Sequence, residues 1–257
     1  MLGAIAGDII GSRFEWHNAS HFDFHLFHPD CRFTDDTVLT LALADSLLSG
    51  VPYVQKLKEY YRRYPEAGFG GSFRRWAQSG SLLPYNSYGN GSAMRVSPVG
   101  FAYDDLELVL SEAERSAAVT HNHPQGILGA QAIAAAIFWA RKGASKDEIR
   151  RQVIERFGYR LDDTVAGLHG VYTFDVSCQG SVPQALIAFL ESSDYESAIR
   201  SAIYIGGDSD TIACMTGGIA QAYYKTLPAG LLDEVLARLD AHLAGVLQAF
   251  NRRWPVI

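Results

Sequence analysis

Two short acidic clusters, each with a threonine beside its aspartates, are the residues best suited to chemistry. Residues 34–37 read T-D-D-T, and residues 208–211 read D-S-D-T directly after Gly206 and Gly207. Only 19% of the chain is charged, and the clusters lie far apart in the sequence. Carboxylates packed this closely repel one another unless protons, hydrogen-bond donors or cations compensate. A bound cation would explain the crowding.

Helix capping is the simpler explanation for the first cluster. Thr34 or Asp35 is a good N-cap for the apolar helical pattern that follows, and acidic residues in a first turn complement the helix dipole. Residues 161–164 read L-D-D-T and have no comparable second cluster beside them. An isolated T-D-D would therefore indicate only the start of a helix.

The second cluster favours a metal site. Two glycines free the backbone before Asp208 for a tight turn, and the spacing of Asp208 and Asp210 lets both carboxylates project the same way. Thr211 then opens a helical pattern. Oxygen-only ligands suit hard cations such as Mg²⁺, Mn²⁺ or Ca²⁺ rather than zinc. If the clusters meet in space, four carboxylates could hold two divalent ions, as in two-metal hydrolases.

A glycine-containing loop is the next candidate for ligand binding. Residues 89–95 read G-N-G-S-A-M-R, in which Met94 replaces the third glycine of a G-x-G-x-x-G motif and no strand pattern precedes. The loop is therefore neither a dinucleotide fingerprint nor a P-loop. Its small residues would still let backbone N–H groups approach an anion, with a plain turn as the alternative.

Three further polar features have both structural and functional explanations. His121 lies between two helical patterns, where it is either a polar residue at a helix start or a group that contacts ligand. Four histidines crowd the aromatic segment 17–28, which favours a loop or short helix near a site entrance over a zinc site. Glu15 is most simply a surface glutamate paired with Arg13.

Helical periodicity dominates the segments that must position these residues. Helices are expected at about 37–49, 53–63, 104–118, 125–142, 145–157, 182–191, 194–203, 211–225 and 230–250. Residues 171–176 are the best, weak candidate for a strand. The glycine-rich stretch 68–100 is the longest irregular segment, and loops on a rigid scaffold often carry sites. We predict an all-α fold with helices in several layers.

Composition sets outer limits on organisation and partners. The 257 residues are 48% hydrophobic and no linker divides them, so residues 1–257 are expected to form a single domain. A net charge of −6 argues against general nucleic-acid binding but not against a small anion held by backbone amides. Three widely spaced cysteines, no signal peptide and no membrane-spanning stretch indicate a cytoplasmic setting.

Five motifs in this order resemble the ADP-ribosylglycohydrolase family, which includes the dinitrogenase reductase-activating glycohydrolases and the ADP-ribosyl-acceptor hydrolases of animals. The motifs are A-I-A-G-D-I-I-G-S-R-F-E-W, F-T-D-D-T, G-N-G-S-A-M-R-V-S-P-V-G, T-H-N-H-P and G-G-D-S-D-T. The resemblance extends from Gly3 to about Tyr224. It implies a compact multi-helix orthogonal bundle of the ADP-ribosylglycohydrolase type.

The resemblance also implies roles for individual residues. Two Mg²⁺ or Mn²⁺ ions would be bound by Thr34, Asp35, Asp36, Asp208, Asp210 and Thr211. The diphosphate and the ribose that carries the scissile bond would be wrapped by Tyr88, Gly89, Asn90, Gly91, Ser92 and Met94. His121 would lie near these groups. Glu15 resembles an N-terminal glutamate that guards or shares the metal site in some members.

The expected reaction is hydrolysis of an N- or O-glycosidic bond between ADP-ribose and an acceptor, with release of ADP-ribose. Departure of the acceptor leaves oxocarbenium-like charge on the ribose, and the two cations would fix that ring and activate water. Asp35, Asp36 or Asp208 would accept the proton of the water, and Glu15 is the next acid/base candidate.

The acceptor stays open among arginine, serine, another side chain, a base or a small metabolite. Residues 17–33 would lie near the entrance and are idiosyncratic. A non-catalytic ADP-ribose-binding protein and a two-metal phosphoesterase that acts on nucleotide diphosphates are the alternative functions.

Overall fold

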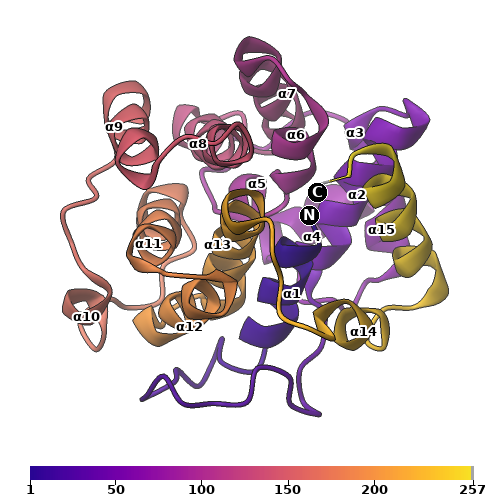
Figure 1. Cartoon of the computed structure of the whole chain (residues 1–257). Coiled ribbons are helices and arrows are strands. Elements are labelled where there is room, and N and C mark those ends of the chain that lie inside the picture. The colour runs from indigo at the N-terminus through magenta and orange to yellow at the C-terminus, as the bar shows by residue number, and fades with distance from the viewer. Residues whose placement is uncertain (256–257) are drawn as a thin grey trace.

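Two apolar helices from opposite ends of the chain pack against each other at the centre of the molecule. The computed structural model describes residues 1–255 (Figure 1). All residues of α1 (Leu2–Gly11) are buried, as is α13 (Ser209–Tyr224) from Ser209 to Ala222. A helix that is buried on every side must lie inside the molecule, and α1 and α13 accordingly share a long contact.

Glycines allow this central contact to be unusually close. A Cβ added at Gly7 would lie 2.1 Å from the carbonyl oxygen of Ala213, and one at Gly217 would lie 2.2 Å from that of Gly3. The amide of Gly3 donates to Gln221 Oε1 at 2.7 Å, and the Tyr195 hydroxyl donates to the Gly3 carbonyl at 2.7 Å. These contacts fasten the N-terminal helix to a distant part of the chain.

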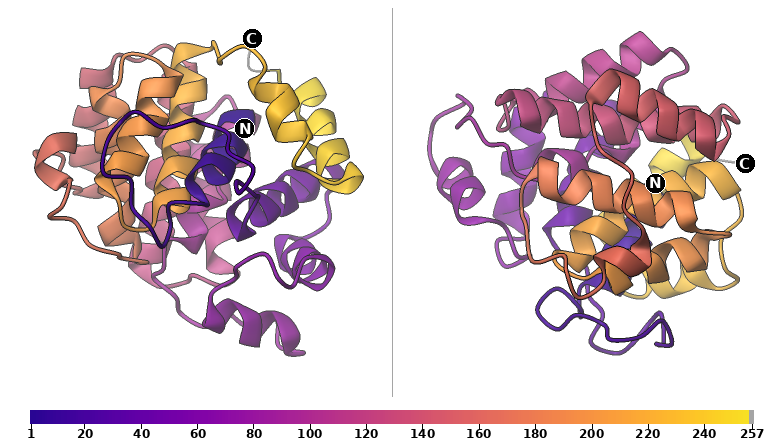
Figure 2. Two further views of the ribbon diagram at one scale, coloured as in Figure 1. Left: turned by 90° about the horizontal axis from the view of Figure 1, so that it is seen from below. Right: turned by 90° about the vertical axis from the view of Figure 1, so that its left-hand side faces the viewer.

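The other helices surround this pair. They are α2 (Asp35–Ser49), α3 (Tyr53–Arg63), α4 (Gly71–Gln78), α5 (Gly91–Met94), α6 (Ser97–Ala102), α7 (Leu106–Ala118), α8 (Pro124–Arg141), α9 (Lys146–Phe157), α10 (Val165–Leu168), α11 (Cys178–Glu191), α12 (Tyr195–Ile205), α14 (Leu231–Leu236) and α15 (Ala241–Arg253). α2 contacts both central helices, whereas α8, α11 and α12 contact α13. The long loop between α1 and α2 crosses one face of the bundle (Figure 2). None of the described helices has the length and apolar character needed to span a membrane.

Local capping signals fixed many helix ends, and the all-α prediction is confirmed, because residues 1–255 contain no strand. Thr34 caps α2 by accepting from the amide of Asp36 at 3.3 Å, and Ser145 caps α9 by accepting from that of Glu148 at 3.2 Å. Gly143 follows α8 with φ 86°, a conformation that suits glycine.

Three expectations about the elements were wrong. Residues 230–250 form two helices rather than one, because Asp240 accepts from the amide of Leu243 at 2.9 Å and starts α15 anew. The stretch 68–100 is not irregular throughout, since it contains α4, α5 and α6. Residues 171–176 form no strand; the nearby backbone pairing is a single bridge between Gly89 and Ser177.

Candidate metal centre and ligand cavity

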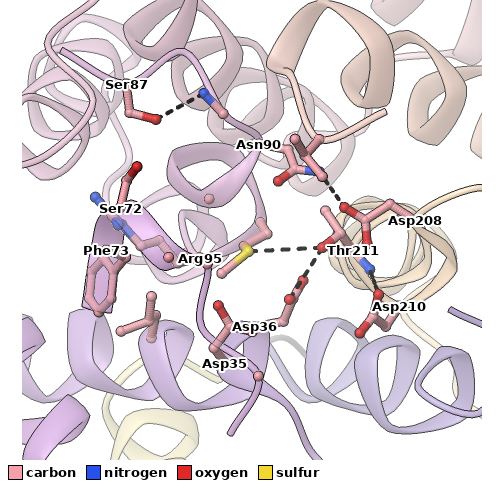
Figure 3. A pocket seen from close by; sticks show the side chains of 18 of the residues that line it. Asp35, Asp36, Ser72, Phe73, Ser87, Asn90, Arg95, Asp208, Asp210 and Thr211 are labelled. Carbon is pink, nitrogen blue, oxygen red and sulfur yellow. Dashed lines mark hydrogen bonds between the residues drawn. The ribbon is translucent and has the colours of Figure 1, made fainter. Parts of the chain in front are cut away.

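The two acidic clusters face each other because they begin the neighbouring helices α2 and α13. The hydroxyl of Thr211 donates to Asp36 Oδ2 at 3.2 Å and so joins the two motifs directly (Figure 3). The backbone amide of Thr211 donates to Asp210 Oδ1 at 2.9 Å. Asp36, Asp210 and Thr211 are buried, so the two helix starts form an enclosed acidic centre.

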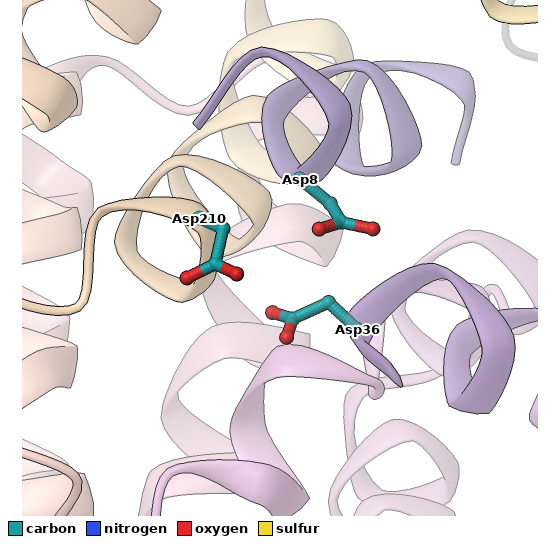
Figure 4. A group of neighbouring side chains, drawn as sticks. All are labelled: Asp8, Asp36 and Asp210. Carbon is teal, nitrogen blue, oxygen red and sulfur yellow. The ribbon is translucent and has the colours of Figure 1, made fainter. Parts of the chain in front are cut away.

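Asp8 of α1 is a third contributor that the sequence reasoning missed. Asp8, Asp36 and Asp210 each place a carboxylate oxygen within 4.8 Å of the others (Figure 4). Asp8 accepts from the hydroxyl of Thr34 at 2.7 Å, from its amide at 3.0 Å, and from the hydroxyl and amide of Thr37. Asp8 therefore fastens the first turn of α2 to α1. In the sequence, the one sign of a role for Asp8 was that it is the single charged residue of an otherwise uncharged helix.

Asp208 and Glu15 extend the centre on another side. One carboxylate oxygen from each of Glu15, Asp208 and Asp210 lies within 4.8 Å of the others. Gly206 and Gly207 take φ values of 87° and 73°, which produce the tight turn that the sequence indicated. The side-chain amide of Asn90 donates to Asp208 Oδ2 at 2.7 Å and thereby ties the glycine-containing loop to the acidic centre.

The charges of this centre are not balanced by salt bridges, although Arg32 lowers the pKa of Glu15. None of the salt bridges formed by residues 1–255 includes an aspartate or glutamate of the centre. Desolvation raises the pKa of Asp35 to about 8, and repulsion by Asp8 and Asp208 acts in the same direction. Desolvation and neighbouring carboxylates also raise the pKa of Asp36 and that of Asp210 well above the usual range.

A divalent cation fits these observations better than protons alone. The Oδ1 atom of Asp36 is buried without a hydrogen-bond partner, although a protonated or amide-bonded carboxyl would be expected to use it. The donors are all oxygens, which suit Mg²⁺ or Mn²⁺. The carboxylates close enough to share such ions are Asp8, Asp36 and Asp210 in one group and Glu15, Asp208 and Asp210 in the other. Of the other predicted ligands, Thr34 donates to Asp8 and Thr211 to Asp36, whereas Asp35 belongs to neither group.

A cavity of about 420 Å³ opens from the acidic centre. Its walls are aromatic and glycine-rich, with the rings of Phe73, Tyr85 and Phe174 and the loop from Gly89 to Gly91. At the rim the exposed indole of Trp16 stacks on Phe174, with ring centroids 5.2 Å apart. Such a cavity suits a ligand of moderate size with one flat part and one part near the acidic centre.

Arg95 and His121 make part of the wall of this cavity suitable for an anion. Arg95 is fully buried, and its Nε and Nη1 atoms have no hydrogen-bond partner. Its Nη2 donates to the hydroxyl of Thr120 at 2.9 Å, and that hydroxyl is 2.7 Å from His121 Nδ1. Burial, and secondarily Arg95, lowers the pKa of His121 well below its usual value.

This chain of contacts favours one tautomer of the imidazole. Arg95 can only donate to Thr120, so the hydroxyl of Thr120 has its own proton free for His121 Nδ1. Nε2 of a neutral His121 then carries the ring proton. Gly91 makes room for this nitrogen, because a Cβ there would lie 3.2 Å from Nε2. His121 can therefore donate a hydrogen bond toward the cavity.

The predicted ligand-binding residues divide into two groups. Gly89, Asn90, Gly91, Met94 and His121 line the cavity. Ser92 does not, because its buried hydroxyl donates to the carbonyl of Gly126 at 2.7 Å. Tyr88 also lies outside the lining, with its ring 53% exposed and 5.3 Å from the ring of His123.

The remaining sequence features lie away from the acidic centre. His17, His21 and His25 are exposed on the loop between α1 and α2, and none of the four histidines of that loop lines the 420 Å³ cavity. Thr164 caps α10 by accepting from the amide of Gly167 at 3.0 Å. The second D-D-T sequence is therefore a helix start without a partner cluster.

Comparison with known proteins places this geometry in a family. The family model described as ADP-ribosylglycohydrolase matches residues 1–255. ADP-ribosylhydrolase ARH3 of Mus musculus is 28% identical, over 87% of this chain and 82% of the relative. ADP-ribosylarginine hydrolase Tri1 of Pseudomonas putida (strain GB-1) is 26% identical, over 100% of this chain and 78% of the relative. A solved structure titled "ADP-ribosylglycohydrolase-related protein complex" aligns with a TM-score of 0.72 and 26% identity, covering 98% of this chain and 96% of the other.

Proposed function

This chain belongs to the ADP-ribosylglycohydrolase family, and on that premise we propose that it hydrolyses the glycosidic bond between ADP-ribose and an acceptor and releases ADP-ribose. The observation that carries the proposal is the buried acidic centre, which forms no salt bridge among residues 1–255 and opens into a cavity that Arg95 and His121 also line. A substrate with a diphosphate and a ribose has the charge and hydroxyl groups to match the two ends.

We propose that the acidic centre binds two divalent cations, Mg²⁺ or Mn²⁺. Their ligands would come from Thr34, Asp35, Asp36, Asp208, Asp210 and Thr211, with Glu15 at the edge. When bound, the cations supply positive charge and Lewis acidity toward ribose hydroxyls and water. Among residues 1–255 these carboxylates form no salt bridge with a lysine or arginine, which supports this assignment.

The residues of the chain would then orient the substrate and move protons. Nε2–H of His121 and the backbone amides around Gly91 would donate to the diphosphate. Asp35, Asp36 or Asp208 would accept the proton from the attacking water. Glu15 is the next acid/base candidate, because burial and the carboxylate of Asp208 raise its pKa. An acid with a raised pKa can give a proton to a leaving group near neutral pH.

The decisive experiment follows products by mass spectrometry. Arginine-, serine- and base-linked ADP-ribose are incubated with enzyme that has been stripped with EDTA and then given Mg²⁺, Mn²⁺ or neither. We expect ADP-ribose from at least one linkage, and only with added cation. Release of ADP-ribose by stripped enzyme at the full rate would overturn the metal assignment. AMP among the products would indicate a phosphoesterase, and binding without release would indicate a non-catalytic ADP-ribose-binding protein.

The first prediction compares two double variants. Asp35→Asn/Asp36→Asn should fold, yet lose cation binding and reduce ADP-ribose release by about 1000-fold or more, since buried ligand and base are both removed. The exposed Asp162→Asn/Asp163→Asn variant removes the same charge from the other D-D-T and is the matched control. Calorimetric titration with Mn²⁺ and the product assay measure both effects. Equal loss in the two variants would contradict the assignment.

A further inference from the structure

A second cavity meets the first at the acidic centre. It has a volume of about 460 Å³ and shares Glu15, Asp35, Gly68 and Asp210 with the first cavity. Its other walls come from segments 32–34 and 63–67, which contribute nothing to the first cavity. The acidic centre is therefore reached from two differently built spaces.

Hydrolysis of a bond between two groups requires room for both of them. The inference rests on the proposed function, in which ADP-ribose occupies the first cavity with its diphosphate near Arg95 and His121. The scissile bond must then lie at the acidic centre, where the two cavities share their walls. The group on the far side of that bond is the acceptor, and the second cavity is the space next to it.

The outer part of the second cavity carries two exposed arginine side chains, and one of them, Arg32, also lowers the pKa of Glu15. Arg32 and Arg63 line it, and neither takes part in a salt bridge among residues 1–255. Glu66 is the one acidic residue of its outer walls. The outer walls, with two arginines and one glutamate, therefore carry a net positive charge that faces the acidic floor.

The remaining wall is apolar and held in place. The rings of Phe33 and Tyr64 meet edge to face with centroids 6.0 Å apart, and Pro65 lies beside them. The hydroxyl of Tyr64 donates to Asp240 at 2.8 Å, which fixes the ring against the start of α15. A side chain bound to ADP-ribose could lie along these rings and bring its neighbours to the two arginines.

We infer that the second cavity binds the acceptor, and that the acceptor it fits is a peptide with an acidic side chain next to the modified residue. Arginines without partners recognise carboxylates by charge and by paired hydrogen bonds. A short peptide agrees better than a nucleic acid with the net charge of −6, because a polyanion would be repelled by the rest of the surface.

The test uses six ADP-ribosylated peptides. ADP-ribose is attached to serine or to arginine, and the neighbouring residue is Glu, Gln or Lys. Each peptide is given to the wild-type enzyme, to Arg32→Gln/Arg63→Gln, and to Arg74→Gln/Arg252→Gln, which loses the same charge from exposed positions outside both cavities. The measured quantities are kcat/KM for ADP-ribose release and the affinity for free ADP-ribose.

For the linkage that is cleaved, we expect kcat/KM to be about 3- to 10-fold higher with Glu than with Lys, a range typical of partly exposed ion pairs. Arg32→Gln/Arg63→Gln should remove this preference and leave the affinity for free ADP-ribose unchanged. The control variant should keep the preference. Equal rates for Glu, Gln and Lys, or a preference that survives in Arg32→Gln/Arg63→Gln, would overturn the inference alone. No release from any peptide would overturn the proposed function, and the inference with it.

Discussion

At the scale of single residues, the acidic centre is held together by contacts between distant parts of the chain, from Thr211 to Asp36 and from Asn90 to Asp208. T-D-D-T and D-S-D-T stood out because several carboxylates share a few positions. Asp8 did not, because one aspartate in an apolar helix becomes informative only when its partners, Thr34 and Thr37, are known to face it. Arg95 was equally hidden: its importance comes from buried guanidinium nitrogens that have no hydrogen-bond partner, which a sequence does not reveal.

The contact between Thr120 and His121 gives a prediction at this scale. Thr120→Val removes the hydroxyl that sets the imidazole tautomer, so affinity for ADP-ribose should fall by about 3- to 10-fold. Calorimetry measures the affinity, and ¹⁵N NMR of the His121 ring should show loss of the single Nε2–H form. Thr120→Ser keeps the hydroxyl and should restore both. If the valine variant retained the same tautomer and affinity, Thr120 would be only a packing residue.

At the scale of elements, the site depends on how closely α1 approaches the start of α13. A Cβ on Gly11 would lie 2.5 Å from Asp210 Cα and 2.7 Å from the carbonyl oxygen of Ser209. This close approach sets the distance between the helix that carries Asp8 and the helix start that carries Asp210. Helix periodicity and caps predicted most helices, but they contain no information on which helices touch. The short helices α4, α5 and α6 were missed because their glycines and prolines resemble those of loops.

Substitution of Gly11 tests the importance of the close contact between α1 and α13. Gly11→Ala should lower the free energy of unfolding by about 1–3 kcal/mol through overpacking, and should also weaken Mn²⁺ binding. Gly245 lies in α15 with no atom within 4 Å of an added Cβ, so Gly245→Ala should raise stability by about 0.5–1 kcal/mol. Denaturant unfolding measures the stability of both variants, and Mn²⁺ titration measures the metal affinity of Gly11→Ala. A Gly11→Ala protein with unchanged stability and metal affinity would show that α1 can shift freely.

For the whole molecule, the acidic centre couples stability to pH and to cations. In metal-free protein the pKa of Asp35 rises from 3.8 to about 8. A carboxyl whose folded pKa is raised stabilises the protein below its unfolded pKa, and that contribution is lost as pH rises through the folded value. His121 has the opposite shift, and it destabilises the fold only as pH falls below its ordinary value of 6.5. Between pH 6.5 and pH 8 the buried amino group of Met1, whose pKa is lowered from 8.0 to about 4, opposes the carboxyls. It is one group against Asp35, Asp36 and Asp210, so the carboxyls set the net trend.

Thermal unfolding in EDTA should show this trend directly. We expect Tm to fall by about 5 °C or more between pH 6.5 and pH 8, and to recover when Mg²⁺ or Mn²⁺ is added. Asp35→Asn should flatten the pH dependence, because the group that releases the proton is absent. A Tm that is constant over this range in EDTA, and indifferent to cations, would contradict the charge crowding described above.

The joining of α1 to α13 has a consequence for synthesis on the ribosome. α1 is synthesised well before its packing partner α13. Until α13 has been made, the growing chain therefore carries an apolar segment that cannot be buried against it. We expect α1 to be a target for chaperones during this time, and any cation to bind the acidic centre only after α13 has packed.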